Sequence, residues 1–320
     1  MNDFELVLPP AVDVREVGMR DGLQLEEPVP LAGKLAMLEA LVATGVQRIE
    51  VTSFVSPRAV PALADADQLA AELHRFDGVR FSALVANTRG AQRAVDAGIA
   101  DLEYVVSASD SHSQANAGRP TAGAVAAVAD IAALAHGAGG SLEVIVATAW
   151  DCPFEGRTPL SRTVDVTRAA VTAGADQLCL GDTIGTTTPL RVVRLLDEVR
   201  RVSPGVPLGA HFHDTRGTGQ ANALVAVQAG VTQLDASVGG LGGCPFAPGA
   251  SGNIATEELV YWLTDAGVRT GIDLDALLAA AAVTREAVGR ELPSSLARAG
   301  GRNAPRGALR PDVVGSGRDC

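Results

Sequence analysis

The chain has 320 residues, of which 47% are hydrophobic, 20% are charged and only 3% are aromatic. This composition supplies enough Ala, Val and Leu for a core and excludes disorder over most of the chain, and the length allows either one large domain or two. The net charge of −11 argues against non-specific binding to nucleic acids or to anionic membranes.

From residue 12 to residue 266, short β-branched runs alternate with Ala- and Leu-rich segments whose apolar residues recur at helical spacing. The predicted strands are Val12–Val17, Arg48–Ser53, Val79–Val85, Asp101–Ser107, Leu142–Thr148, Gln177–Asp182, Pro207–His213 and Thr232–Val238. The predicted helices are Leu31–Thr44, Asp65–Arg75, Thr88–Ala97, Ala122–His136, Ser161–Thr172, Pro189–Arg200, Gly217–Gln228 and Asn253–Ala266. Several helices are followed by a glycine typical of a C-cap, as at Gly45 and Gly98.

Eight strand–helix units within about 250 residues favour a TIM (β/α)8 barrel, although periodicity alone leaves an open doubly wound sheet as the alternative. Residues Asp273–Glu291 are predicted to add a C-terminal helical segment that covers the barrel or another subunit. We therefore expect one barrel domain over residues 1–292. Residues 293–320, rich in Gly, Pro, Arg and Ser, are predicted to be a flexible tail.

The sequence contains no apolar run of the ~20 residues that a membrane span needs, and it begins without the features of a signal peptide. We therefore expect a cytoplasmic protein that does not bind membranes. The four cysteines are widely spaced and form no CxxC pair, which favours free thiols over disulfides or a structural zinc site. They are Cys152, Cys179, Cys244 and Cys320.

Two histidines end the seventh predicted strand. Because side chains alternate along a strand, His211 and His213 point to the same face, which at a barrel strand end is the mouth. Two imidazoles placed in this way can share a metal ion, and the alternative is a pair of histidines that only bond to each other. His112, in the Ser- and Asn-rich segment after the fourth strand, is a further candidate for a substrate contact.

Charged residues occupy two other predicted strand ends. Arg20 and Asp21 follow the first strand, where they would project into the same mouth, and Gly22 permits a tight turn. Glu50 lies within an otherwise apolar strand and needs a partner or a place near the open end, where it could orient Arg20 or a ligand water. The alternatives are a surface salt bridge beside a turn glycine for the Arg–Asp pair and a surface position for Glu50.

A glycine-rich segment, GGLGGCPFAPGASGN, follows the eighth strand. Its backbone freedom would allow it to close over the mouth and to present Cys244 as a proton-transfer group; the alternative is a flexible loop with a packing cysteine. The Lys-Ser/Thr pair of a phosphate-binding P-loop is missing. Asn253, at the end of the segment, could cap a helix or offer its side-chain oxygen to a metal.

In this order, the segments VGMRDGLQ, IEVTSFVSPRAVP, LGDTIG, HFHDT and GLGGCPFAPGASGNIATEELVY resemble the 3-hydroxy-3-methylglutaryl-CoA lyase family of the metal-dependent lyase and synthase barrels. The resemblance runs from about Val14 to Arg290, and the GLGGCP segment distinguishes the lyase branch from the related synthases. It implies a TIM barrel that uses Mg²⁺ or Mn²⁺ to cleave 3-hydroxy-3-methylglutaryl-CoA, an anionic acyl-CoA substrate, into acetyl-CoA and acetoacetate. It also implies a homo-oligomer, expected to be a dimer, and a role in leucine degradation or ketone-body formation.

By this resemblance, the metal ligands are Asp21, His211, His213 and Asn253. The implied catalytic set is Cys244, Arg20, Asp21, Glu50 and His211, with Arg20 stabilising the thioester enolate and Cys244 moving a proton. Either Asp21 or His211 could act as the base. The implied substrate contacts are Arg20, Gln24 and Asp182, and Arg58 and Arg216 could add positive potential at the mouth.

The sequence departs from the family pattern outside this set, most clearly at Leu25, where the family has Asn, and at Glu27, where Lys is common. An apolar Leu25 near the mouth suggests a different substituent at C3 of the substrate. The alternative function is therefore a lyase for citramalyl-CoA or for a longer 3-hydroxy-3-carboxymethylacyl-CoA. A synthase would need a larger C-terminal domain, and a non-catalytic barrel would not need the metal set together with Cys244.

Overall fold

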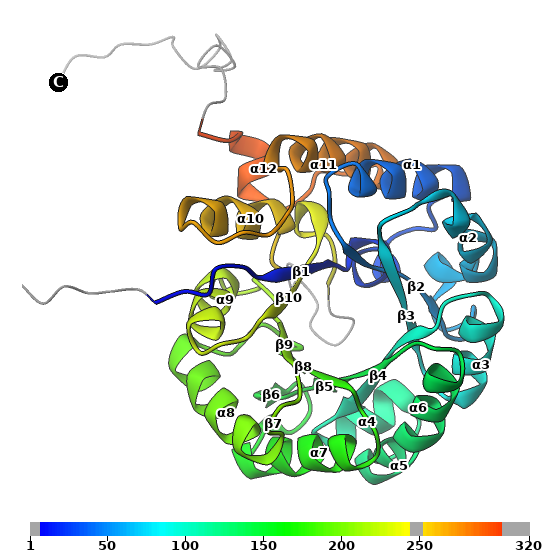
Figure 1. Ribbon diagram of the computed structural model, residues 1–320, viewed down its shortest axis with the longest axis vertical. Coiled ribbons are helices and arrows are strands. Elements are labelled where there is room, and N and C mark those ends of the chain that lie inside the picture. Colours follow the sequence, from blue (N-terminus) through cyan, green and yellow to red (C-terminus); the bar gives the residue numbers. More distant parts are fainter. Residues whose placement is uncertain (1–6, 244–251, 303–320) are drawn as a thin grey trace, which may run out of the picture.

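Eight parallel strands form a closed barrel in the computed structural model, which describes residues 7–243 and 252–302 (Figure 1). Around the barrel the strands follow the order β1-β10-β9-β8-β5-β4-β3-β2. Their bounds are β1 Asp13–Glu16, β2 Arg48–Phe54, β3 Arg80–Val85, β4 Asp101–Ser107, β5 Leu142–Ala147, β8 Gln177–Gly181, β9 Leu208–His211 and β10 Gln233–Ala236. Pairing of β1 with both β10 and β2 closes the barrel, so the TIM barrel is confirmed and the open sheet is excluded.

Helices surround the barrel, since the outer faces of buried parallel strands must be covered by apolar helix faces (Figure 1). They are α1 Leu31–Val42, α2 Ala66–Glu72, α3 Thr88–Asp96, α4 Asp110–Ala117, α5 Thr121–Ala126, α6 Val128–Gly137, α7 Leu160–Thr172, α8 Pro189–Val202, α9 Gly219–Gln228 and α10 Thr256–Asp265. Gly45 and Gly98 have φ of 85° and 88°, as a helix C-cap requires, and lead into β2 and β4.

The structure adds elements that periodicity did not predict. The Ser- and Asn-rich segment after β4, where no helix was predicted, contains α4. This helix begins where the Ser109 hydroxyl accepts a hydrogen bond from the His112 amide and ends at Gly118 with φ of 66°. Helix α4 was not predicted because its residues are mostly polar. The helix expected over Ala122–His136 is divided into α5 and α6, and a small antiparallel hairpin, β6 Asp151–Cys152 and β7 Gly156–Arg157, precedes α7.

A C-terminal pair of helices covers one side of the barrel. Helix α11, Leu274–Val288, lies beside α1 and α10, as expected for the C-terminal segment (Figure 1). The short helix α12, Ser295–Ala299, then falls within the stretch expected to be a tail, and the Ser294 hydroxyl caps it. The domain boundary at residue 292 stays a prediction, and residues 303–320 lie outside the described residues.

Across residues 7–243 and 252–302, no helix combines the length and the hydropathy that crossing a bilayer requires. The core consists mainly of Val, Leu and Ala side chains, in keeping with the scarcity of aromatic residues. The interior of the barrel also holds charged side chains, of which Arg15, Glu50 and Glu103 are at most 1% exposed. Because a buried charge is costly unless it is paired, we expect these side chains to form ion pairs with one another.

Candidate active site

A cavity of about 150 Å³ opens at the carboxyl ends of the strands, the end where barrel enzymes carry their chemistry. The apolar part of its lining comes from the barrel strands. The lining residues are Arg20, Asp21, Gln24, Leu84, Val105, His112, Asn116, Ile145, Ala147, Gly181, Thr183, His211, His213 and Gly243. The predicted mouth residues Arg20, Asp21, His211 and His213 therefore meet in one cavity.

The turn that carries Arg20 and Asp21 is one turn of π-helix, Gly18–Gly22, directly after β1. Buried Glu16 holds this turn: one carboxylate oxygen accepts from the amides of Gly18, at 2.7 Å, and Val238, at 2.9 Å. The other oxygen accepts from the Thr256 hydroxyl at 2.6 Å. A Cβ at Gly18 would lie 2.6 Å from that carboxylate, so the residue there must be glycine. Glu16 thus links the Arg–Asp turn to the start of the glycine-rich segment.

His211, His213 and Asp21 converge on one point. The Nε2 atoms of the two histidines are 3.0 Å apart, and His211 Nε2 is 4.0 Å from an Asp21 carboxylate oxygen. One ligand atom from each of the three residues lies within 4.8 Å of the others, and all three side chains are buried. Two imidazole nitrogens and a carboxylate at this spacing can hold a divalent cation.

Asn253 completes the set expected from the sequence. Its side-chain amide donates to an Asp21 oxygen, at 2.8 Å, and to the Leu241 carbonyl, at 3.0 Å, while its own Oδ1 is buried without a hydrogen-bond partner. Its backbone forms an antiparallel bridge with His213. A buried unpaired oxygen is costly, so a cation beside it would satisfy an atom that the protein leaves unsatisfied. The donors present therefore fit a divalent metal.

Sequence reasoning missed Asp235, which orients the first histidine. Its carboxylate lies 3.1 Å from Nδ1 of His211, so that Nε2 faces Asp21 and His213. Residues that bond to the second ring nitrogen of a histidine fix its tautomer and orientation. A lone acidic residue in a predicted strand, 24 positions beyond His211, carries no motif that would have identified it.

The side chain of Arg20 is fixed by two carboxylates. Its Nη1 donates to Asp21 at 2.7 Å, and its Nε lies 2.6 Å from Glu50, which is fully buried. Arg20 is therefore the partner that a buried carboxylate in an apolar strand requires. Burial, opposed by Arg20 and assisted by the nearby Glu103, raises the pKa of Glu50 above its ordinary value.

The charges around the histidines separate their pKa values. Burial and the charge of His211 lower the pKa of His213 to about 4. Burial alone would also lower the pKa of His211, but Asp235 and Asp21 overcome it and raise that pKa. For Asp21, burial is outweighed by Arg20 and the two histidines, and its pKa falls below the ordinary value. At neutral pH the site thus presents an ionised carboxylate and a neutral His213.

The remaining predicted residues lie in different places. Gln24 lines the cavity and donates to Asp21 at 2.9 Å. His112 also lines it, with Nδ1 2.6 Å from the Ser107 hydroxyl, and burial lowers its pKa to about 4. The carboxylate of Asp182 accepts from the amides of Thr186 and Thr187, and its neighbours Gly181 and Thr183 provide the lining instead.

Three other residues expected near the mouth are not part of the described lining. Leu25 is 50% exposed, and Arg216 bonds to backbone carbonyls at Ile184 and Gly185. Arg58 is also exposed and lines no part of the cavity in the described chain. Cys244 lies outside the described residues, directly after Gly243 in the sequence, so its expected role stays a prediction.

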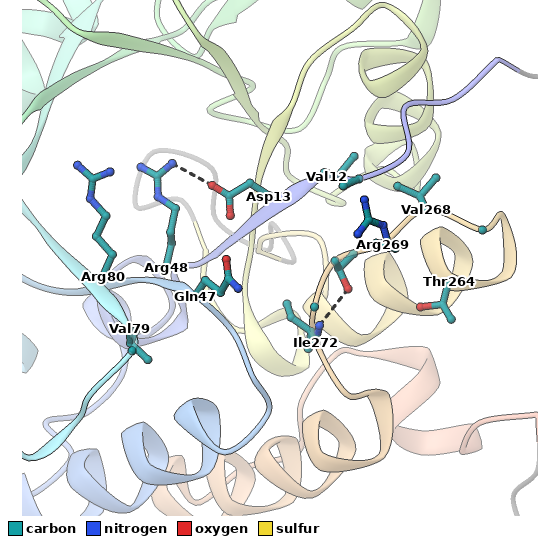
Figure 2. Close-up of a pocket in the computed structure, with 15 residues that line it drawn as sticks. Val12, Asp13, Gln47, Arg48, Val79, Arg80, Thr264, Val268, Arg269 and Ile272 are labelled. Carbon is teal, nitrogen blue, oxygen red and sulfur yellow. Dashed lines mark hydrogen bonds and ion pairs between the residues drawn. The ribbon is translucent and has the colours of Figure 1, made fainter.

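A larger hollow, of about 1370 Å³, lies at the opposite end of the barrel (Figure 2). Asp13, Arg48 and Arg80, the first residues of β1, β2 and β3, contribute to its lining. Arg48 pairs with Asp13 at 3.0 Å and Arg80 with Asp101 at 2.5 Å, so these arginines are already neutralised by carboxylates. Because this end of a TIM barrel serves stability, we place the chemistry in the smaller cavity.

Two curated relatives of similar sequence are named as acyl-CoA lyases. A hydroxymethylglutaryl-CoA lyase from Bacillus subtilis is 40% identical over 288 residues, which cover 89% of this chain and 96% of the relative. The (R)-citramalyl-CoA lyase of Chloroflexus aurantiacus is 41% identical over 301 residues, 91% of this chain and 95% of the relative.

Two solved structures have a similar fold. An HMG-CoA lyase from Acinetobacter baumannii, in complex with coenzyme A and 3-methylmalate, superposes with a TM-score of 0.87 at 39% identity and covers 92% of this chain and 97% of its own. The HMG-CoA lyase of Bacillus subtilis gives a TM-score of 0.88 at 38% identity, with 91% and 98% covered. Residues 11–284 match the family described as HMGL-like. The chain belongs to the HMGL-like family.

Proposed function

We propose that this protein is an acyl-CoA lyase that cleaves 3-hydroxy-3-methylglutaryl-CoA into acetyl-CoA and acetoacetate. The observation that carries the proposal is the convergence of Asp21, His211 and His213 beside a buried, doubly paired Arg20. This set combines a cation-binding group with a fixed positive charge in one small cavity, as a retro-Claisen cleavage needs. The relatives named hydroxymethylglutaryl-CoA lyase support the assignment of the substrate.

The reaction needs two proton movements and no oxidant. The C3 hydroxyl loses its proton to a base of the site, Asp21 or His211, and the C3–O bond becomes the carbonyl of acetoacetate. The electron pair of the C2–C3 bond passes to C2, which leaves as the enolate of acetyl-CoA. A proton delivered to C2 then completes acetyl-CoA, so atoms and charges balance.

Arg20 is the group placed to stabilise the developing enolate. Its guanidinium is held by Asp21 and Glu50 before any substrate binds, so it need not reorganise as negative charge develops on the thioester oxygen. A single donor held in this way contributes roughly 3–4 kcal/mol to the transition state. Cys244, which follows Gly243 of the cavity lining, is proposed to deliver the proton to C2.

Asp21, His211, His213 and Asn253 would hold a divalent cation, proposed to be Mg²⁺ or Mn²⁺. Nitrogen and oxygen donors together suit such ions, and when bound the cation would lower the pKa of the C3 hydroxyl. We propose Gln24, which lines the cavity, as a substrate contact. We propose Asp182 as a further contact, although its carboxylate also holds its own turn.

A second substrate has support of its own. The (R)-citramalyl-CoA lyase matches this chain at 41% identity, level with the hydroxymethylglutaryl-CoA lyases. Citramalyl-CoA has the same thioester and C3 hydroxyl but is one methylene shorter, so the same site could cleave it. One methylene changes binding in an apolar pocket by about 1–3 kcal/mol, which makes the preference measurable.

We further propose a homodimer in the cytoplasm.

The test is a comparison of kcat/KM for three thioesters: 3-hydroxy-3-methylglutaryl-CoA, citramalyl-CoA and a longer 3-hydroxy-3-carboxymethylacyl-CoA. Release of acetyl-CoA from each is followed in the presence of Mg²⁺. We expect the first to be cleaved with a kcat/KM at least tenfold above the others. A higher value for citramalyl-CoA would transfer the assignment to that substrate, and cleavage of none of the three would contradict the proposal.

A further inference from the structure

A buried ion cluster lies inside the barrel below the proposed active site. It is centred on Arg15 of β1, whose side chain is 1% exposed. Three carboxylates from other strands surround the guanidinium: Asp235 of β10, Glu103 of β4 and Glu143 of β5. The cluster therefore joins four strands, and nothing in the reaction proposed above makes use of it.

One branch of the cluster ends on a histidine of the site. Arg15 donates two hydrogen bonds to Asp235 from one edge of its guanidinium, with Nε 2.9 Å from Oδ1 and Nη2 2.8 Å from Oδ2. The same Oδ2 of Asp235 lies 3.1 Å from Nδ1 of His211. A bidentate pair fixes the plane of the carboxylate. Arg15 thereby fixes the oxygen that orients the His211 ring.

A second branch leads towards Arg20. Arg15 Nη1 lies 2.8 Å from Glu103, which accepts from the Ser82 hydroxyl, and Ser82 of β3 is the register partner of Glu50 of β2. Glu50 in turn lies 2.6 Å from Nε of Arg20. This path through Glu103, Ser82 and Glu50 therefore runs from Arg15 in the barrel to Arg20, which lines the cavity.

Glu143 differs from the other two carboxylates. It lies 2.6 Å from Arg15 and accepts from Gln233 at 3.0 Å, but none of its described contacts reaches His211 or Arg20. Burial, partly opposed by Arg15, raises the pKa of Glu143 to about 7. Glu143 thus belongs to the same cluster but does not contact the site. Its substitution therefore provides a matched control for substitution of Arg15.

We propose that Arg15 is a positioning residue of the active site: it holds His211 in its metal-binding orientation through Asp235, and Arg20 through Glu103 and Glu50. The inference rests on the proposed function for the identity of the site, but its first branch concerns cation binding and needs no substrate. A purely structural role for Arg15 would instead change stability alone.

The test measures the affinity of the full-length, chelator-treated protein for Mn²⁺ by calorimetry, together with the rise in Tm that Mn²⁺ produces. Arg15→Lys keeps the positive charge but loses the two-point contact with Asp235, and removal of such an outer partner typically weakens metal binding 10–100-fold. We expect Arg15→Lys to raise the Mn²⁺ Kd at least tenfold. Glu143→Gln, in the same cluster, should leave the Kd within twofold of the wild type.

Two more variants separate the branches and guard against misfolding, which circular dichroism monitors. Asp235→Asn should raise the Mn²⁺ Kd in the same way as Arg15→Lys, and it carries the test if Arg15→Lys does not fold. Glu103→Gln should lower kcat at least tenfold with an unchanged Mn²⁺ Kd.

An Mn²⁺ Kd for Arg15→Lys equal to that of the wild type would overturn the inference, as would an equal loss in Glu143→Gln. A wild type that binds Mn²⁺ but cleaves no thioester would contradict the proposed function while the Kd comparison still decides the role of Arg15.

Discussion

Replacement of Arg20 by glutamine tests the role of the fixed positive charge most sharply. Glutamine retains a polar group of similar reach but removes the guanidinium that contacts Asp21 at 2.7 Å and Glu50 at 2.6 Å. Loss of one pre-oriented donor to a developing oxyanion costs about 3–4 kcal/mol, so kcat should fall roughly 10²–10³-fold. Because uniform binding is little changed, KM should change much less than kcat.

The same substitution should destabilise the fold. Glu50 is fully buried and would lose its cationic partner, a change that costs about 3–5 kcal/mol when a charge is left unpaired. Because the pKa of Glu50 is raised, its carboxyl group can become protonated and lose its charge. We therefore expect a cost at the lower end of this range. For a chain of this size, a loss of about 3 kcal/mol lowers Tm by about 4 °C.

The assay combines steady-state release of acetyl-CoA with Mn²⁺ calorimetry on the same preparation. The expected result is a large loss of kcat with Mn²⁺ affinity within a few-fold of the wild type, because Arg20 is not among the proposed ligands. Arg20→Lys, which restores a positive charge, should recover part of kcat. Loss of Mn²⁺ binding together with kcat would refute the reasoning, since it would show that Arg20 supports the site structurally.

Three further predictions concern other residues. Burial raises the pKa of Glu16 from 4.5 to about 7, so its contribution to stability is complete below about pH 4.5 and is lost as the pH rises through 7. In urea titrations, the free energy of unfolding of Glu16→Gln should rise relative to that of the wild type by roughly 3 kcal/mol between pH 5 and pH 8. Parallel pH profiles of the two proteins would contradict this. Asn253→Ala should raise the Mn²⁺ Kd at least tenfold in calorimetry, whereas an unchanged Kd would exclude Asn253 as a ligand. Cys244→Ala should lower kcat by about 10²-fold or more without changing Mn²⁺ affinity, and full activity would remove Cys244 from the mechanism.

Much of the fold could be predicted because short strand segments alternate with helices whose apolar residues recur at helical spacing, and each of the eight predicted strands overlaps an observed one. The period of two placed His211 and His213 on one face, and their Nε2 atoms are 3.0 Å apart. The barrel then explains why Asp21, 190 residues earlier, reaches them, since β1 and β9 both flank β10. Helix α4 escaped prediction because its polar residues give no apolar periodicity.

The charged interior could not be predicted, because its order comes from closure of the barrel. Arg15 and Asp235 are 220 residues apart and meet only because β1 pairs with β10. In the sequence, Arg15 is one of three charged residues of β1 and Asp235 is the charged residue of β10, and nothing local indicates which carboxylate faces Arg15. The cluster around Arg15 and the orientation of His211 therefore required the three-dimensional structure.

Metal-dependent cleavage of 3-hydroxy-3-methylglutaryl-CoA is the most direct test of the proposed function. Purified protein is treated with EDTA, divided, and incubated with the thioester with or without added Mg²⁺ or Mn²⁺, and both products are quantified. We predict acetyl-CoA and acetoacetate in a one-to-one ratio after metal is restored and no turnover in the chelated sample. Equal turnover in the chelated sample would contradict the account, as would the absence of acetoacetate among the products.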